Sequence, residues 1–269
     1  MRFARLFLFC LLSCGGSEGG DPHSNPGVPP AEGKDLRISD ITNPASDKKA
    51  SHLQQVSVSG VRVLHVDKFD ETRDGKSQGT IYVQDLLPDQ KVGYAGTSLF
   101  APEFVPGNLR VGPGDVLDMR GTYQQNQTLG TTVTFAPGAT LDQLARPVAT
   151  FRYEDKPAQP VLIDVNDLSD YAKGRRWLNM LVKVENVEIQ GPLIRAMSGR
   201  ASVDITPGGT GGQIACEQAF PKPATLTNEL ADLAPLQING KMRVKSITGI
   251  VTFFCNLHLS PRSIEDVEK

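Results

Sequence analysis

Residues 238–266, INGKMRVKSITGIVTFFCNLHLSPRSIED, decide the fold of this 269-residue chain. A turn of small residues leads into two apolar runs with the character of β-strands, and a polar segment follows them. Residues 114–142 hold a weaker copy of the same plan. Three pairs of landmarks, each separated by 124 to 128 residues, relate the two stretches: Gly114 and Gly240, Gly121 and Gly249, Pro137 and Pro261. Spacing this regular predicts a duplicated β unit.

A second correspondence lies upstream of each stretch. Residues 56–63, VSVSGVRV, align with residues 182–189, VKVENVEI, at an offset of 126 residues. Alternation of apolar and polar side chains predicts a strand with one buried face in both places. Gly60 falls opposite Asn186, and glycine and asparagine are the residues that best tolerate a left-handed backbone. We therefore expect the same bulge in both strands.

The remaining strand signals complete the first unit. Five segments have strand character: residues 56–63, 80–85, 96–100, 116–123 and 131–135. A new series begins near Pro160. The sequence thus predicts a mainly β protein with few short helices, divided into domains over residues 36–150 and 151–269.

Particular motifs make this prediction more specific. Residues 80–85, TIYVQD, the Gly114 and Gly121 pair, and Trp177 shortly ahead of residues 181–187 resemble OB-fold modules of bacterial envelope lipoproteins, which also occur beside extracellular nucleases. The resemblance implies an all-β fold of two tandem five-stranded, OB-like Greek-key barrels. The second unit departs from the pattern because the glycine-rich residues 206–212 stand where its copy of the TIYVQD strand should lie. Its middle strands are the least defined in the sequence.

The N-terminus carries signals for export. Arg2 and Arg5 precede a short apolar run, which is the layout of a secretory signal and too short to span a bilayer. Residues 11–14, LLSC, resemble the bacterial lipoprotein signal, which implies cleavage after residue 13 and lipidation of Cys14. An ordinary secretory signal with an incidental cysteine is the alternative. Gly15 directly after the cysteine resembles lipoproteins that are sent to the outer membrane.

The next segment predicts a tether. Residues 14–35 are rich in Gly, Pro and Ser and almost free of apolar side chains, so they cannot bury enough surface to offset the entropy of ordering. We expect a flexible linker between a lipid anchor in the bacterial cell envelope and the β units.

The charge balance bears on the class of partner. The chain has 28 basic and 30 acidic residues, and removal of residues 1–13 takes away two arginines. The mature protein is therefore mildly acidic. Because general affinity for nucleic acid comes from neutralising phosphates, this balance disfavours nucleic acid as a partner without excluding a local site.

The cysteines predict one disulfide. Cys10 leaves with the signal and Cys14 takes the lipid, so Cys216 and Cys255 remain. In an oxidising compartment we expect these two to pair, with two buried free thiols as the alternative. Neither has a partner at CxxC spacing and the four histidines are scattered, so no metal site or cofactor is predicted.

Few residues are candidates for binding. An OB barrel offers the face of its second and third strands, which points to Tyr82 and Gln84. Arg175, Arg176 and Trp177 form a basic and aromatic cluster that could grip a base or a sugar. For each group the structural alternative is strong: packing at a strand entry for the tryptophan cluster, and a role in the following turn for Gln84.

No sequence signature of catalysis is present, including GxSxG and HExxH. We therefore expect a non-enzymatic, lipid-anchored envelope protein that binds an envelope protein or a glycan. Two alternatives stay open. One is an accessory nucleic-acid-binding module of a secreted nuclease system, and the other is a structural spacer or assembly protein.

Overall fold

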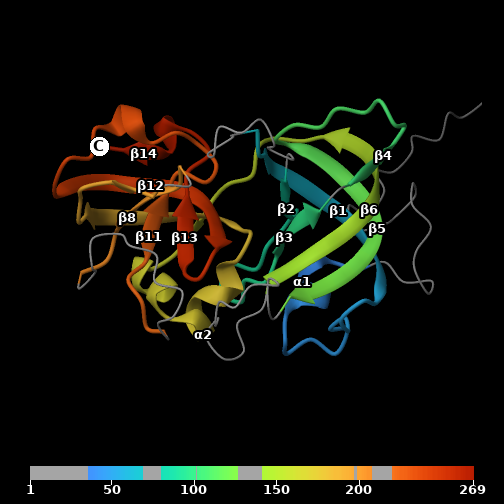
Figure 1. Cartoon of the computed structure of the whole chain (residues 1–269). Coiled ribbons are helices and arrows are strands. Elements are labelled where there is room, and N and C mark those ends of the chain that lie inside the picture. Colours follow the sequence, from blue (N-terminus) through green and yellow to red (C-terminus); the bar gives the residue numbers. More distant parts are fainter. Residues whose placement is uncertain (1–35, 69–79, 101, 127–140, 197–198, 208–219) are drawn as a thin grey trace, which may run out of the picture.

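The computed structural model describes residues 36–68, 80–100, 102–126, 141–196, 199–207 and 220–269. The fold is mainly β, with two sheets and few short helices, as predicted. Each sheet encloses its own apolar core, and the two stand side by side (Figure 1). We call the first sheet with its core module 1 and the second module 2.

The described residues of module 1 form six strands: β1 (Gln55–Val66), β2 (Ile81–Asp85), β3 (Gly96–Phe100), β4 (Glu103–Val105), β5 (Asp115–Asn126) and β6 (Leu141–Glu154). Their order is β3-β2-β1-β5-β6-β4, and β3 also pairs in parallel with β6. This last pairing closes β1, β2, β3, β6 and β5 into a ring. Inward side chains of these strands form the core, among them Val58, Val83, Leu117 and Leu144.

The expected bulge is present in β1. Gly60 has a φ of 64°, and the register between β1 and β5 shifts between Val58 and Val61. The amide of Gly60 donates to Oδ1 of Asp118 at 2.8 Å, and Arg152 lies 3.3 Å from the same buried carboxylate. The bulge is thus fixed by a buried acid that is itself paired with a cation, as burial of a charge requires.

A short helix closes the end of the ring at which β2 ends. This helix, α1 (Ile38–Thr42), buries Ile38 and Ile41 against the core. Asp85 at the end of β2 accepts the amide of Ile38 at 2.7 Å and both the amide and the hydroxyl of Ser39, at 3.0 and 2.7 Å. Complete burial raises the pKa of Asp85 to about 6, although these hydrogen bonds oppose the shift.

The fifth strand of the ring differs from the prediction. The ring closes through β6, which the sequence did not indicate as a strand, and the predicted strand at residues 131–135 lies outside the described residues. β6 continues past the predicted domain limit at residue 150 to Glu154. Pro147 inside β6 conceals the strand pattern, because proline removes a ladder hydrogen bond. It lies where β5 and β6 shift register, beside Gly121.

In module 2 eight strands lie within the described ranges: β7 (Val161–Leu162), β8 (Leu181–Ile189), β9 (Ile194–Arg195), β10 (Ala201–Asp204), β11 (Thr225–Thr227), β12 (Met242–Phe253), β13 (Leu257–Ser260) and β14 (Val267–Glu268). The order is β7-β8-β12-β13-β11-β10-β9, with β14 on β12. β11 and β13 pair in parallel, as β3 and β6 do in module 1.

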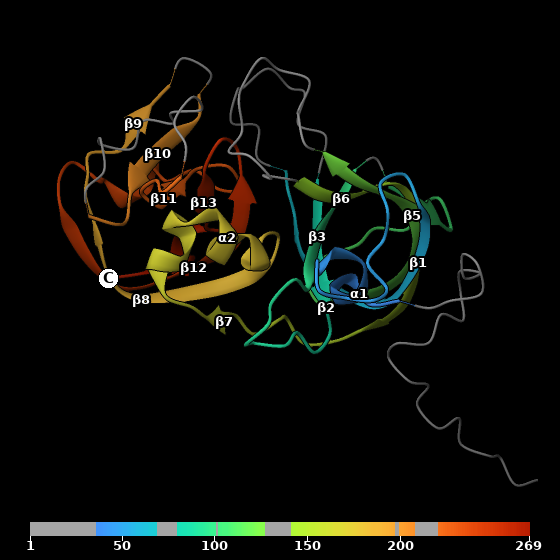
Figure 2. The ribbon, with the colours of Figure 1, turned by 90° about the horizontal axis from the view of Figure 1, so that it is seen from below.

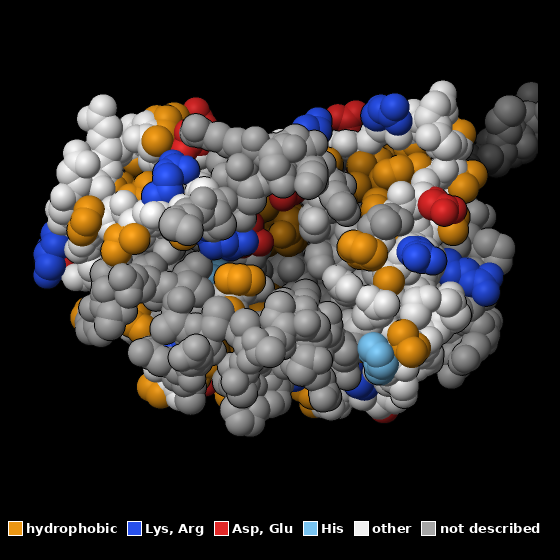
Figure 3. Space-filling view, viewed as in Figure 1, with side chains coloured by type: hydrophobic (Ala, Val, Ile, Leu, Met, Phe, Trp, Pro, Cys, Tyr) orange, Lys and Arg blue, Asp and Glu red, His pale blue; other side chains and the backbone are white. Residues whose placement is uncertain are grey.

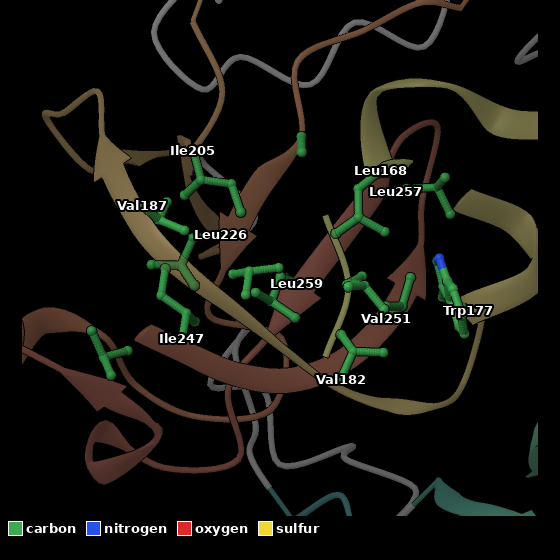
Figure 4. Close-up of a cluster of buried hydrophobic side chains, with 14 of the residues drawn as sticks. Leu168, Trp177, Val182, Val187, Ile205, Leu226, Ile247, Val251, Leu257 and Leu259 are labelled. Atoms are coloured by element: carbon green, nitrogen blue, oxygen red, sulfur yellow. The ribbon is translucent and has the colours of Figure 1, made fainter. Parts of the chain in front are cut away.

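Helical turns cover one end of module 2. They are η1 (Val165–Ser169), α2 (Tyr171–Gly174) and η2 (Arg175–Trp177), while η3 (Ala234–Leu236) and η4 (Ile264–Asp266) lie later in the chain. Figure 2 shows α2 lying across the module 2 strands. Leu168 and Trp177 from these turns join the strand residues in the core, where Val182, Val251 and Leu259 meet (Figure 4).

The duplication predicted from the sequence has a structural counterpart. β8 corresponds to β1, and Asn186 has a φ of 54° where Gly60 has 64°. The left-handed residue therefore recurs, but β8 pairs with β12 without a register shift, so the bulge does not. Gly249 in β12 corresponds to Gly121 in β5. A Cβ on Gly249 would lie 2.8 Å from the Ser260 oxygen, and one on Gly121 would lie 3.1 Å from Pro147 Cα. Because neither glycine has a side chain, the next strand in each module, β13 or β6, can cross at close distance.

Candidate functional site

The two modules are joined by backbone contacts rather than by side chains alone. Tyr94 donates its amide to the Arg176 carbonyl at 2.6 Å, and Leu181 donates its amide to Gln84 Oε1 at 3.2 Å. Gly96 lies so close to module 2 that an added Cβ would be 2.4 Å from the carbonyl carbon of Asn179. The modules therefore meet at van der Waals distance along this seam.

An apolar cluster continues the seam. It draws side chains from both modules and from the connection between them: Leu64, Tyr82, Ala158, Leu181, Leu230 and Ile250. Burial of such side chains stabilises the junction by about 25 cal/mol for each Å² removed from water. The relative position of the modules is thus held by apolar packing as well as by hydrogen bonds.

Beside this seam lies a cleft of about 160 Å³. Both modules supply its lining: Thr80, Tyr82, Ser98, Leu99, Phe100, Gln143, Asn179, Glu229, Thr252 and Phe253. Figure 3 shows the surface hollowed between the two halves, with hydrophobic, acidic and basic side chains at the hollow. We call this site the inter-module cleft.

The module 1 wall of the cleft is the outer face of β2, β3 and β6. In a strand alternate residues point to opposite faces, so Leu99 enters the core while Ser98 and Phe100 face outward. Tyr82 pairs with Ser98, and Ser98 with Gln143, which places a ring, a hydroxyl and an amide in one row. Phe100 at the end of β3 keeps 49% of its surface exposed.

The module 2 wall contains an organised carboxylate. Oε2 of Glu229 accepts the Thr252 hydroxyl at 2.5 Å and lies 3.4 Å from Nη1 of Arg200. Thr252 also meets the Ser260 hydroxyl at 2.8 Å, and the Arg200 guanidinium stacks 4.8 Å from the Phe254 ring centre. The side chains of Glu229 and Arg200 are 20% and 16% exposed. The Glu229 carboxylate is therefore a partly buried hydrogen-bond acceptor whose position is fixed by Thr252 and Arg200.

A second hollow is shallower and less polar. It measures about 300 Å³ and is lined by His65, Val66, Lys68, Val111, Gly112, Pro113 and Leu230. Burial and the nearby Arg262 lower the pKa of His65. Ligand sites typically combine an apolar surface with several convergent polar groups. The inter-module cleft has that combination, so we take it as the candidate site.

The predicted binding residues are distributed between the cleft and its supports. Tyr82 lines the cleft with 6% of its surface exposed. Gln84, on the same face of β2, is 1% exposed and holds the Leu181 amide. Its contact is with module 2 and not with the following turn.

The tryptophan cluster lies in the structure as a packing unit. Trp177 is 2% exposed and donates its indole N–H to Asp167 Oδ2 at 3.1 Å. Arg176 pairs with the same oxygen at 2.9 Å and lies 4.5 Å over the indole ring. Arg175 precedes them in η2 and is partly buried. A ligand-binding role for these three residues stays a prediction.

The predicted cysteine chemistry falls largely outside the described residues. Cys255 is disulfide-bonded and 2% exposed. Its expected partner, Cys216, and the expected lipidation site, Cys14, both lie outside the described residues. The pairing and the lipid therefore stay predictions.

Of the residues that line the cleft, only Tyr82 was predicted from the sequence, and Glu229 and Phe100 are the most important of those that were not. Glu229 has no partner at a recognisable spacing, because Thr252 reaches it from β12 and Arg200 from the residue before β10. Phe100 carried a usable signal: period two over residues 96–100 places it opposite Leu99, on the outer face.

Within the described ranges, no three His, Cys, Asp or Glu residues gather in a way that could hold a metal ion. The same part of the chain contains no helix with both the length and the apolar character needed to cross a membrane.

Comparisons of the chain with protein-family models, curated proteins and solved structures gave no match.

Proposed function

We propose that this protein is a lipid-anchored lipoprotein of the bacterial cell envelope that binds a glycan, without enzymatic turnover, in the cleft between two OB-like modules. The observation that carries this proposal is the inter-module cleft itself. It brings exposed aromatic surface, hydroxyls, amides and a fixed carboxylate together on a rigid junction. Sugars need this combination, because their rings have apolar faces and their edges carry hydroxyls.

The strand order supports an OB-like assignment for module 1. An OB fold is a five-stranded Greek-key barrel that presents the face of its second and third strands to ligands. In module 1 the strands β1, β2, β3, β6 and β5 form a closed ring of five, and the cleft lies on the outer face of β2 and β3. Module 2 repeats the parallel closing pair with β11 and β13.

The charge of the cleft favours a glycan over nucleic acid. Glu229 is the charged side chain among the described lining residues, and a carboxylate repels a phosphate backbone. Arg200, the nearest cation, is already engaged by Glu229 and Phe254. Salt-sensitive binding of single-stranded DNA that is lost on replacing Arg175, Arg176 and Trp177 would instead support the nuclease-associated alternative.

The proposed anchor rests on residues 1–35. Cys14→Ser should release the protein into the periplasm or the medium, whereas the wild type should fractionate with membranes. Continued membrane fractionation of the variant would contradict the lipid anchor while leaving the binding proposal standing.

The binding proposal is tested with the full-length protein in detergent, applied to an array of envelope-type glycans and to single-stranded DNA. We expect retention on glycans and no turnover of glycoside, ester or phosphodiester substrates. Gly96→Val should abolish retention, since its side chain would collide with the backbone at Asn179 and separate the modules. Gly112→Val is the matched control, because a Cβ at Gly112 meets nothing within 4 Å.

Three results would contradict the proposal. Ordinary enzymatic turnover of any of these substrates would assign a catalytic function. Retention of a specific envelope protein in place of glycans would assign a protein partner. Indifference to every ligand, together with unchanged behaviour of the Gly96→Val variant in cells, would favour the structural spacer.

A further inference from the structure

The acceptor capacity of Glu229 is only partly used. Both of its contacts, from Thr252 and from Arg200, end on Oε2. Oε1 has no hydrogen-bond partner among the described residues, and the residue lines the cleft. An ionised carboxylate only accepts hydrogen bonds, and each oxygen can take more than one. Glu229 therefore presents an acceptor to whatever enters the cleft.

Arg200, the cation that pairs with Glu229, also makes another contact. The Arg200 guanidinium stacks on Phe254, its Nη1 faces Oε2, and its side chain is 16% exposed. Arg200 does not line the cleft. Among the described lining residues a ligand therefore meets the Glu229 carboxylate, which attracts hydrogen-bond donors and disfavours negative groups.

The opposite wall offers an apolar surface. Phe100 is half exposed in the cleft lining, with the Ser98 hydroxyl two residues before it on the same face of β3. The amide nitrogen of Gln143 donates to Gln124 Oε1 at 2.7 Å, which orients its own oxygen as a further acceptor. At about 160 Å³ the cleft is smaller than a typical site for a drug-sized ligand, so it suits one ring of a longer chain.

We propose that the cleft selects a neutral sugar ring, which stacks on Phe100 and donates hydroxyl hydrogens to Glu229, and that Glu229 excludes sugars that carry a carboxylate. This inference rests on the proposed glycan-binding function and names the class of glycan. The negative charge of Glu229 performs both tasks: it strengthens the hydrogen bonds from hydroxyls and it penalises an acidic ring.

The test compares two probes by isothermal titration calorimetry on the full-length protein in detergent. One probe is the fully N-acetylated chitotriose, which is neutral, and the other is trigalacturonic acid, which is acidic. We expect the wild type to bind chitotriose at least tenfold more tightly than trigalacturonic acid. Glu229→Gln should weaken chitotriose binding about tenfold, as a charge-assisted hydrogen bond becomes neutral, and should narrow the difference between the probes.

Two matched controls separate this effect from general damage. Glu185→Gln changes a 48% exposed carboxylate on β8, away from the cleft lining, and should leave both affinities unchanged. Phe100→Ala should weaken both probes about fivefold to tenfold through lost stacking. Phe151→Ala, at a 42% exposed ring outside the cleft lining, should not. The thermal midpoint and the fluorescence of Trp177 report whether each variant is folded.

The outcomes distinguish this inference from the function on which it rests. Binding of either probe with no preference, or a preference that Glu229→Gln does not alter, overturns the selection by Glu229 while glycan binding stands. Tighter binding of the acidic probe overturns it as well and indicates Arg200 as the recognition group. Failure of the wild type to bind any glycan on the array overturns both proposals.

Discussion

The two modules share a strand plan but close it differently. In module 1 the first strand pairs with the second, since β1 meets β2 from Val61 to Val66, and the ring is complete. In module 2 the corresponding strands, β8 and β10, are joined by one backbone hydrogen bond, from the Gln190 amide to the Asp204 carbonyl at 2.8 Å. The short β9 pairs with β10 instead. The central strands of the two modules thus correspond more closely than the strands that close them.

Module 2 has other means of stabilisation. The turns η1, α2 and η2 insert Leu168, Tyr171 and Trp177 into its core, and Cys255 is disulfide-bonded. In the part of module 1 that the structure describes, the short helix α1 closes the end of the ring and is held by Asp85. A complete ring needs less covering, because its strands satisfy one another's backbone groups.

The largest expected effect concerns the disulfide and should fall on module 2. Reduction, or Cys255→Ala, should lower the free energy of unfolding by about 2 to 5 kcal/mol, which is the typical effect of removing a disulfide from a small domain. Denaturation followed by the fluorescence of Trp177, the single tryptophan of the chain, reports module 2. Hydrogen exchange in β1 reports module 1 and should change little. Mass mapping without reduction should show Cys216 joined to Cys255, and alkylation of both as free thiols would contradict the pairing.

The second prediction concerns acid and again separates the modules. Burial lowers the pKa of His258 to about 4, so the neutral ring is favoured in the folded state. Stability from this residue is present above pH 6.5 and is lost as the pH falls toward 4, by up to about 3 kcal/mol. His258→Gln should remove this slope from the unfolding free energy of module 2. An unchanged slope in the variant would assign the acid sensitivity to another group.

The third prediction concerns Asp85, whose contribution to stability changes with pH in the direction opposite to that of His258. Asp85 in module 1 has its pKa raised to about 6, so its contribution is present below pH 4 and is lost as the pH rises through 6. The loss should be about 3 kcal/mol, the free-energy equivalent of a pKa raised from 3.8 to about 6. Asp85→Asn should flatten the slope measured by hydrogen exchange in β1. Equal slopes in wild type and variant would refute the shift.

The smallest expected effect compares the paired left-handed residues. Gly60→Ala should cost about 1 to 2 kcal/mol, because a Cβ is disfavoured at a φ of 64°. Asn186→Gly should be neutral or slightly stabilising, since glycine suits the φ of 54° better than asparagine. Urea denaturation at neutral pH measures both. A costly Asn186→Gly would mean that the asparagine side chain, and not its backbone conformation, matters at this position.

The sequence predicted the parts of the fold that depend on local pattern. Alternation of apolar and polar residues indicated six of the strands, namely β1, β2, β3, β5, β8 and β12. Gly60 and Asn186 both have the left-handed conformation that their residue types predicted. β6 was missed because Pro147 interrupts it, and β10 and β11 are too short to show a period. These strands depend on partners far away in the chain, which a local pattern does not record.

Only the residues on the module 1 wall of the candidate site could be predicted from the sequence. Tyr82 was found because it lies on the face of β2 that the OB resemblance indicates, and Phe100 could have been found by the same alternation. Glu229 could not, because its importance comes from Thr252 and Arg200, which reach it through tertiary structure. Gln84 lies on the predicted face, but the second module occupies the space in front of it.

The attachment of Leu36 to β1 has a mechanical consequence. Leu36 donates its amide to the Ser57 carbonyl at 3.0 Å and accepts the Ser59 amide at 3.1 Å, forming a parallel bridge beside Val58. Tension applied through the preceding residues would load these two bonds together, and then the Asp85 contacts to α1. Beyond them lies the paired ladder of β1. A pull on the N-terminus is thus received first by β1 and β2, within the complete ring of module 1.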